Sequence, residues 1–266
     1  MKKYKLIVFD IDGTLLPFGV ESLSAKTKKM VHELKEKGYV VVFATGREFV
    51  TIGTLLDDIP VDYFIGANGA FIYDLNKKEV VFENKIILSE FQTLSNFLEK
   101  FNCEYSVMTD KWGYFSDGHD LDTWFLSPHK ENFKNLCELT CDEEPLHLVT
   151  IRANDKSFKN TVQEFIDKNN LNMEINAQWS KGFFIGPKNT NKATGLKKLY
   201  KFTKITLDEM IAFGDSSNDV EMLSEVGYSV ALAGGWSYLK TIAKDVTTKT
   251  VEEDGVYYKL KELGIL

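Results

Sequence analysis

The chain has 266 residues, of which 44% are hydrophobic and 27% are charged, and its formal net charge at pH 7 is −7. These values are typical of a globular protein with one large domain or two unequal ones. The acidic balance disfavours nucleic acid and anionic membranes as partners, because both are bound through basic surfaces. Three cysteines give no disulfide framework, which suits a reducing compartment.

The N-terminal segment predicts neither a signal peptide nor a membrane anchor. Its apolar run, residues 6–9, is too short for the core of a signal peptide and is followed at once by Asp10. No stretch of the chain approaches the roughly 20 apolar residues that a membrane span requires. We therefore expect a cytoplasmic protein, either a monomer or a homodimer.

The beginning of the chain alternates between strand and helix patterns. Apolar runs at residues 6–9, 39–44 and 63–65 predict strands, and the segments 24–37 and 49–58 predict helices. This βαβαβ order predicts a parallel sheet with helices on both faces.

The pattern changes in the middle of the chain and later returns. A hairpin is predicted around the letters DLNKK, at residues 70–83. Beyond it we expect helices at 89–101 and 155–169, and strands at 104–108, 113–116, 146–152, 173–176 and 182–185. The first rhythm resumes with a helix at 193–202, a strand at 210–213, a helix at 219–225 and a strand at 228–232.

The expected fold class is therefore α/β, with a doubly wound, Rossmann-like parallel core sheet and an inserted α/β domain. Residues 1–83 and 188–266 are expected to form the core. Residues 84–187 are expected to form the inserted domain.

Three of the predicted core strands end in small polar clusters. The first is followed by DIDGT, the second by TGR and the strand at 210–213 by GDSSND. In open parallel sheets, ligands bind outside the carboxyl ends of the strands. The three clusters are therefore expected to meet at one site.

The first and third clusters bring carboxylates together. Asp10 and Asp12 are two positions apart, so an extended chain would point them the same way, and Asp215 would join them from a neighbouring strand. Carboxylates at about 4 Å repel by roughly 4 kcal/mol per pair at an effective dielectric constant near 20. A cation or a raised pKa is needed to hold them there, and Mg²⁺ with its preference for oxygen ligands suits the cluster best.

Other residues of these clusters suit an anion. Thr45 and Gly46 lie where a strand turns into a helix, so a hydroxyl and backbone amides can face a phosphate. Lys192 opens a predicted helix, where the helix dipole disfavours a cation unless an anion is shared there.

Taken together, DIDGT, ATGR, the lysine at 192, GDSSND and the late EDGV resemble the haloacid dehalogenase superfamily of phosphatases, and in particular its Cof-type branch with a large α/β cap. The resemblance covers essentially the whole chain. The combination of motifs at this spacing is very specific, whereas any one of them alone would be weak.

The resemblance implies a set of roles. Asp10 would be the nucleophile that forms an aspartyl-phosphate, and Asp12 the general acid and base. Mg²⁺ would be held by Asp10, Asp215 and the backbone carbonyl of Asp12, and the phosphate by the site residues Ile11, Thr45, Gly46, Lys192 and Asn218. Asp219 would orient Lys192 or the waters of the metal, and Arg47 is interpreted as a supporting ion-pair residue.

The chain departs from the family pattern at three places. Ala193 follows the motif lysine where glycine is common, which leaves Lys188 as a fallback. Glu48 follows TGR where proline is common, and AGGW replaces a loop that often contains Asn-Ala. The four histidines lie outside every motif and are assigned no catalytic role.

The expected activity is hydrolysis of a small phosphate ester, a sugar phosphate or a phosphorylated cofactor. The motifs leave open a phosphomutase or phosphotransferase acting on a sugar phosphate. A non-catalytic phosphate-binding protein is the remaining alternative, although the intact set of carboxylates argues against it.

Overall fold

A computed structural model describes residues 3–57, 59–101, 103–139, 144–153, 155 and 157–266. Contacts divide the chain into two compact units. The core unit comprises Met1–Gly46, Ile52–Phe82 and Asn191–Leu266, and the inserted unit comprises Arg47–Thr51 and Glu83–Thr190. The predicted fold class is confirmed, whereas the exact boundaries at residues 84 and 187 stay predictions.

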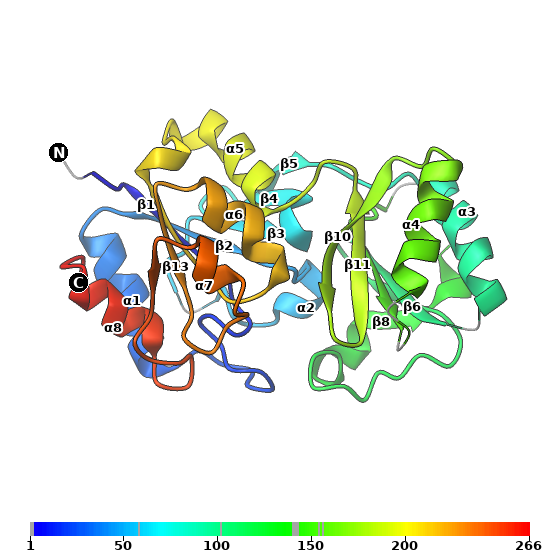
Figure 1. Ribbon diagram of the computed structural model, residues 1–266, viewed down its shortest axis with the longest axis horizontal. Helices are drawn as coiled ribbons and strands as arrows, with labels where there is room; N and C mark the ends of the chain where they lie inside the picture. The colour runs from blue at the N-terminus through cyan, green and yellow to red at the C-terminus, as the bar shows by residue number, and fades with distance from the viewer. Residues whose placement is uncertain (1–2, 58, 102, 140–143, 154, 156) are drawn as a thin grey trace. The chain divides into compact units, whose positions relative to one another are not determined.

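The core unit is built on an eight-stranded sheet with the order β14-β13-β12-β1-β2-β3-β4-β5 (Figure 1). Its strands are β1 (Leu6–Phe9), β2 (Val40–Ala44), β3 (Tyr63–Gly66), β4 (Phe71–Asp74), β5 (Glu79–Glu83), β12 (Met210–Gly214), β13 (Tyr228–Ala231) and β14 (Asp245–Val246). Strand β1 lies at the centre and pairs in parallel with β12 and β2. Strand β4 is antiparallel to β3, so the parallel part of the sheet ends at β3.

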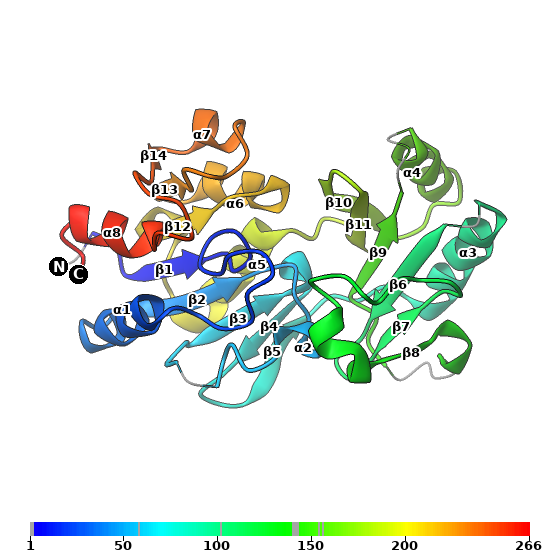
Figure 2. The same cartoon turned by 90° about the horizontal axis from the view of Figure 1, so that it is seen from below.

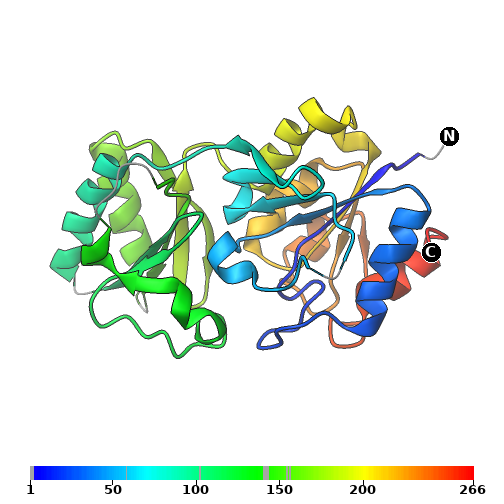
Figure 3. The ribbon, with the colours of Figure 1, turned by 180° about the vertical axis from the view of Figure 1, so that it is seen from behind.

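Helices cover both faces of this sheet. The helices assigned wholly to the core unit are α1 (Ala25–Glu36), α5 (Lys192–Thr203), α6 (Val220–Glu225), α7 (Leu239–Ile242) and α8 (Gly255–Glu262). Leucines of α5 and α6, among them Leu196 and Leu223, pack with Leu6 and Val8 of β1. Helices α1 and α8 contact each other and lie together on the other side of the sheet (Figure 3).

Helix α1 follows directly from its sequence. The Ser24 hydroxyl accepts a hydrogen bond from the Thr27 amide at 3.0 Å, which caps the first turn. Apolar residues at helical spacing, Met30, Val31 and Leu34, are fully buried. Gly38 then takes a positive φ of 74°, which ends the helix as predicted.

One predicted helix, at residues 49–58, is wrong in length. Helix α2 (Phe49–Ile52) has a single turn, because Gly53 takes a left-handed φ of 55° directly after it. The two-residue strand β14 and the helices α7 and α8 were not predicted. The strand and α7 are too short to give a readable periodicity.

The inserted unit has a six-stranded sheet with the order β10-β11-β9-β6-β7-β8. Its elements are α3 (Leu88–Leu98), β6 (Glu104–Met108), β7 (Gly113–Phe115), β8 (Phe133–Asn135), β9 (Leu148–Arg152), α4 (Phe158–Lys168), β10 (Met173–Trp179) and β11 (Gly182–Pro187). Figure 2 shows α3 and α4 on one face of this sheet, where Leu94 and Val162 pack with Val107 and Val149. Among the described residues, no helix combines the length and apolar character needed to cross a membrane.

Substitution of Gly227, which lies between α6 and β13, tests how closely the core unit is packed. A Cβ on Gly227 would lie 2.0 Å from the backbone oxygen of Asp208, so Gly227→Ala must displace backbone. We expect a loss of about 1–3 kcal/mol in the free energy of unfolding, measured by urea titration. Gly234→Ala is the matched control, because its Cβ would meet nothing within 4 Å. Equal stabilities of the two variants would contradict this account of the packing.

Candidate active site

The strand register brings the three polar clusters to one edge of the core sheet. Phe9, the last residue of β1, pairs with Phe213 of β12 and with Phe43 of β2. The amide of Asp10 donates to the carbonyl of Phe213 at 3.0 Å, which extends the pairing one residue further. The residues that follow β1, β2 and β12 therefore leave the sheet at neighbouring points.

A buried lysine joins two carboxylates at this edge. Lys192 is fully buried at the first turn of α5, and its Nζ lies 2.5 Å from Oδ1 of Asp10 and 2.7 Å from Oδ1 of Asp219. Both aspartates are buried as well. The fallback candidate Lys188 is exposed and belongs to the inserted unit, so the geometry favours Lys192.

Helix α5 can begin at Lys192 because its N-terminus is capped locally. The side chain of Asn191 accepts from the amide of Thr194 at 2.9 Å, and the Thr194 hydroxyl accepts from the amide of Asn191 at 2.9 Å. Gly195 allows the helix to approach the end of β3, where a Cβ would lie 2.8 Å from Ile65. The glycine that was expected at position 193 thus lies two positions later, at 195.

The carboxylate of Asp215 is held by hydroxyl groups. Its Oδ1 accepts from the Thr14 hydroxyl at 3.0 Å, and its Oδ2 accepts from the Ser216 hydroxyl at 3.1 Å. A side chain at Gly13 would collide with it, because a Cβ there would lie 2.4 Å from Oδ2. The glycine of DIDGT is therefore required for Asp215 to reach the site.

Asp219 supports the site from behind. Its Oδ2 accepts from the backbone amides of Asp215 at 2.9 Å and Ser216 at 3.0 Å, while its Oδ1 faces Lys192. Both of its oxygens are thus engaged in fixing the loop after β12 and the lysine. These contacts fit the supporting role that the sequence suggested for this residue.

Burial dominates the electrostatics of the cluster. Desolvation raises the pKa of Asp10 to about 7, although the neighbouring Lys192 opposes the rise. Desolvation and the charge of Asp10 also raise the pKa of Asp215 well above its ordinary value. Burial alone would lower the pKa of Lys192, but Asp10 and Asp219 outweigh it and raise the pKa.

The donor set fits a divalent cation. Ligand atoms of Asp10, Asp215 and Asp219 lie within 4.8 Å of one another, and all three residues are buried. One lysine cannot balance three carboxylates, so a divalent ion would neutralise the remaining charge. Both oxygens of Asp219 are used to hold Lys192 and two backbone amides, whereas Asp215 accepts from two hydroxyl groups, so we take Asp10 and Asp215 as the candidate ligands.

The predicted phosphate residues lie around an asparagine that sequence reasoning missed. Asn68 has a left-handed φ of 55° after β3, its Oδ1 accepts from Asn218 Nδ2 at 2.9 Å, and a Cβ on Gly46 would lie 3.3 Å from the same oxygen. Its Nδ2 is buried and has no hydrogen-bond partner among the described residues. The Asn-Gly dipeptide at 68–69 was the available signal, since it marks a positive φ.

For three predicted site residues, the structure gives contacts outside the cluster of carboxylates. Ile11 is fully buried, and its carbonyl accepts from the amides of Leu15 and Leu16 in the turn after β1. Asp12 is half-buried and forms a bridge with Leu16 in the same turn. Arg47 belongs to the inserted unit, where its guanidinium donates to the carbonyl of Thr51 at 2.6 Å.

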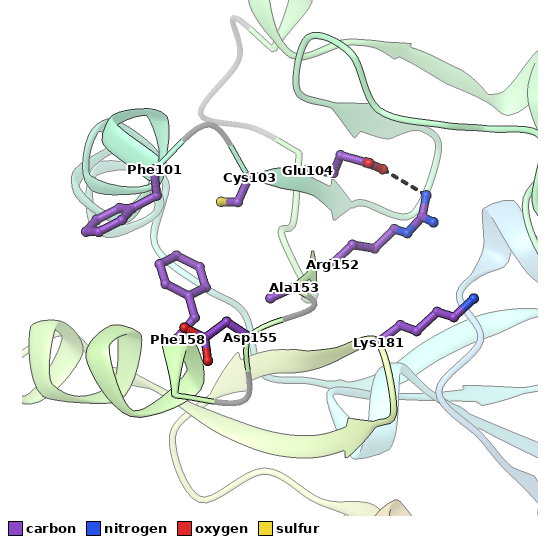
Figure 4. A pocket seen from close by; sticks show the side chains of 8 residues that line it. All are labelled: Phe101, Cys103, Glu104, Arg152, Ala153, Asp155, Phe158 and Lys181. Carbon is purple, nitrogen blue, oxygen red and sulfur yellow. Dashed lines mark hydrogen bonds and ion pairs between the residues drawn. The ribbon is translucent and has the colours of Figure 1, made fainter.

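The inserted unit contains a separate pocket of about 350 Å³ (Figure 4). Arg152 and Glu104 form an ion pair at 2.8 Å on its wall, and the rings of Phe101 and Phe158 lie opposite. None of the predicted site residues lines it. The candidate active site therefore rests on the strand edge of the core unit.

A parallel core sheet with an inserted α/β domain, and carboxylates gathered around a lysine at the strand ends, defines a class of hydrolases. A family model described as haloacid dehalogenase-like hydrolase matches residues 7–260, and the chain belongs to this family. The predicted hydrolase class is thereby confirmed.

Relatives and solved structures agree with this assignment. The 5-amino-6-(5-phospho-D-ribitylamino)uracil phosphatase YcsE of Bacillus subtilis is 30% identical over 95% of this chain and 92% of its own length. The phosphatase of the same name, YitU, from the same organism is 27% identical over 97% of this chain and 96% of its own. The structure of the HAD subclass IIB sugar phosphatase BT4131 has a TM-score of 0.85 at 23% identity, with 98% of this chain and 100% of that chain covered, and it shows the shared fold.

The raised pKa of Asp10 gives a testable pH dependence. Folded protein holds this proton up to about pH 7, whereas an unfolded carboxyl loses it near pH 3.8, so the metal-free protein loses stability as pH rises between these values. Asp10→Asn removes the buried charge, and we expect it to be about 1–3 kcal/mol more stable than wild type at pH 8. The difference should vanish near pH 4. Urea unfolding in EDTA measures it, and a less stable variant at pH 8 would refute this view of the site.

Proposed function

We propose that this hydrolase is a magnesium-dependent phosphatase that acts on a small phosphorylated metabolite through an aspartyl-phosphate on Asp10. The observation that carries the proposal is the buried cluster in which Lys192 contacts Asp10 beside Asp215 and Asp219. A phosphoryl-transfer site needs such a nucleophile with positive charge around it.

The proposed reaction has two steps. The carboxylate of Asp10 attacks phosphorus, the bond from phosphorus to the leaving oxygen breaks, and Asp12 gives that oxygen a proton. Asp12 then takes a proton from a water molecule, which attacks phosphorus and releases phosphate from Asp10. Lys192 holds the orientation of Asp10 and places its charge beside the transferring group.

The metal site is proposed to consist of the carboxylates of Asp10 and Asp215 and the backbone carbonyl of Asp12. Bound Mg²⁺ would supply neutralising charge for the phosphoryl oxygens. Thr14 and Ser216 keep the Asp215 carboxylate in place through their hydroxyl groups.

The phosphate oxygens are proposed to bind at Thr45, Gly46, Asn218 and the backbone of Ile11. Asn68 supports this group, because it accepts from Asn218 and its own Nδ2 is left with hydrogen-bonding capacity. A bound phosphate oxygen would satisfy that buried donor, which is costly to leave unpaired.

The substrate class is proposed as a sugar phosphate or a phosphorylated cofactor. The names of YcsE and YitU specify a phosphorylated ribitylaminouracil, and that of BT4131 a sugar phosphatase. These names all specify small phosphorylated compounds. A cytoplasmic location and a monomeric or homodimeric state are further parts of the proposal.

Two lysine variants test the proposal. With an aryl phosphate as substrate, we expect Mg²⁺-dependent release of inorganic phosphate that Lys192→Met lowers by at least about a hundredfold. Lys188→Met is the matched control and should retain activity, because Lys188 is an exposed lysine of the inserted unit. Asp10→Asn should reduce turnover to background, since the nucleophile is lost.

Three outcomes would count against the proposal. Near-full turnover by Asp10→Asn would exclude the aspartyl-phosphate, and activity unaffected by EDTA would exclude the metal. An isomeric sugar phosphate in place of inorganic phosphate would identify a mutase instead.

A further inference from the structure

Residues 47–51 leave the core unit directly after the proposed phosphate-binding residues Thr45 and Gly46. The chain passes from the core unit to the inserted unit after Gly46 and returns at Ile52. This excursion is separate from the long insertion that starts at Glu83 and ends at Thr190. The proposed phosphate site is therefore joined by one peptide bond to a segment that packs with the other unit.

The segment is anchored by apolar and polar contacts. Val50 is buried with Met108, Leu126 and Phe133, and its carbonyl accepts from Asn132 Nδ2 at 2.9 Å. The guanidinium of Arg47 lies 5.2 Å from the centre of the Phe125 ring, in the range of a cation–π contact.

Internal hydrogen bonds make the segment a closed turn. The amide of Glu48 donates to the Thr51 hydroxyl at 3.0 Å, and the amide of Thr51 donates to the carbonyl of Glu48 at 3.0 Å. Arg47 closes the same turn through the carbonyl of Thr51. A restraint on the position of the Glu48 side chain therefore also restrains the backbone next to Gly46.

A fully buried ion pair holds Glu48. The side chains of Glu48 and His147 have no exposed area; His147 Nδ1 lies 3.2 Å from Oε1 of Glu48 and forms its hydrogen bond with Oε2 at 3.4 Å. His147 Nε2 lies 3.1 Å from Oε1 of Glu83, so both ring nitrogens face carboxylates. Only the protonated imidazole can donate from both nitrogens, which makes His147 the cation of the cluster.

The charge state of His147 follows from its surroundings. Burial alone would lower its pKa, but Glu48 and Glu83 raise it to about 9. Asp110 also faces Glu48, and Lys85 lies near Glu83. The imidazole is therefore charged at neutral pH and loses its charge as pH rises through about 9.

We propose that Glu48 and His147 are positioning residues for phosphate binding, because their ion pair fastens the chain next to Gly46 to the inserted unit. The inference rests on the proposed function. Glu48 is two residues from Gly46 along the chain, so fixing its side chain restrains the backbone beside the proposed phosphate residues. Neither residue touches the reacting atoms, and both act through the backbone of residues 45–47.

Steady-state kinetics distinguish positioning from a purely structural role. With an aryl phosphate and Mg²⁺, Glu48→Gln should raise KM and the inhibition constant of inorganic phosphate about tenfold, while kcat changes less than about threefold. The double variant Glu48→Gln/His147→Gln should show the same changes in KM, inhibition constant and kcat. It serves as the second test if the single variant folds poorly, because it leaves neither member of the pair as a lone buried charge.

The matched control is Asp245→Asn in the core unit. Asp245 accepts from the nearly buried Lys259 at 3.2 Å and from the Tyr228 hydroxyl at 2.7 Å, far along the chain from residues 47–51. This variant should lose stability without changing KM. Equal KM effects in Asp245→Asn and Glu48→Gln would overturn the inference.

The pH profile gives an independent readout. Wild-type KM should rise above pH about 9, when His147 loses its charge, and this rise should be absent in Glu48→Gln. The same rise in both proteins would overturn the inference.

Hydrogen exchange separates this inference from the proposed function. The amides of residues 46–51 should exchange faster in Glu48→Gln than in wild type or Asp245→Asn, whether or not the protein hydrolyses phosphate esters. Unchanged exchange would overturn the inference. Absence of hydrolysis by wild type would overturn only the proposed function.

Discussion

The contact between Lys192 and Asp10 is the interaction on which the site depends. Burying Asp10, Asp215 and Asp219 together is costly, and the ammonium group of Lys192 offsets part of that cost. The offset is incomplete, as the raised pKa of Asp10 shows, so the site retains an affinity for further positive charge. A bound cation would offset the remaining charge of these buried carboxylates, which is the physical basis of the metal site that we propose.

The rest of the core unit serves to keep these groups in place. Parallel pairing of β1 with β12 and β2 aligns the strand ends, and Gly13 leaves room for Asp215. Asp219 fixes the loop backbone and the lysine at the same time. Side chains that are distant in the sequence lie within hydrogen-bonding distance of one another because the paired strands fix the positions of the loops that bear them.

Much of this arrangement could be predicted from the sequence. Asp10 and Asp215 were found because each closely follows an uninterrupted apolar strand, and Lys192 because it opens a helix. The pairing of Glu48 with His147 could not be found, since 99 positions separate the residue that follows TGR from a histidine that lies in no motif. The true end of α2 was also hidden, because its apolar pattern continues past the turn that Gly53 imposes.

The loop after β13 contains a tryptophan whose fluorescence can report on the candidate active site. Trp236 is the only tryptophan in the sequence of the core unit, and the residue is 46% exposed. Its amide donates to the carbonyl of Asp215 at 2.7 Å. Its indole is therefore tethered through the backbone to a carboxylate of the cluster and remains in contact with water. Replacing the three tryptophans of the inserted unit would leave Trp236 as the one source of tryptophan emission, and selective excitation of tryptophan would then report on this loop.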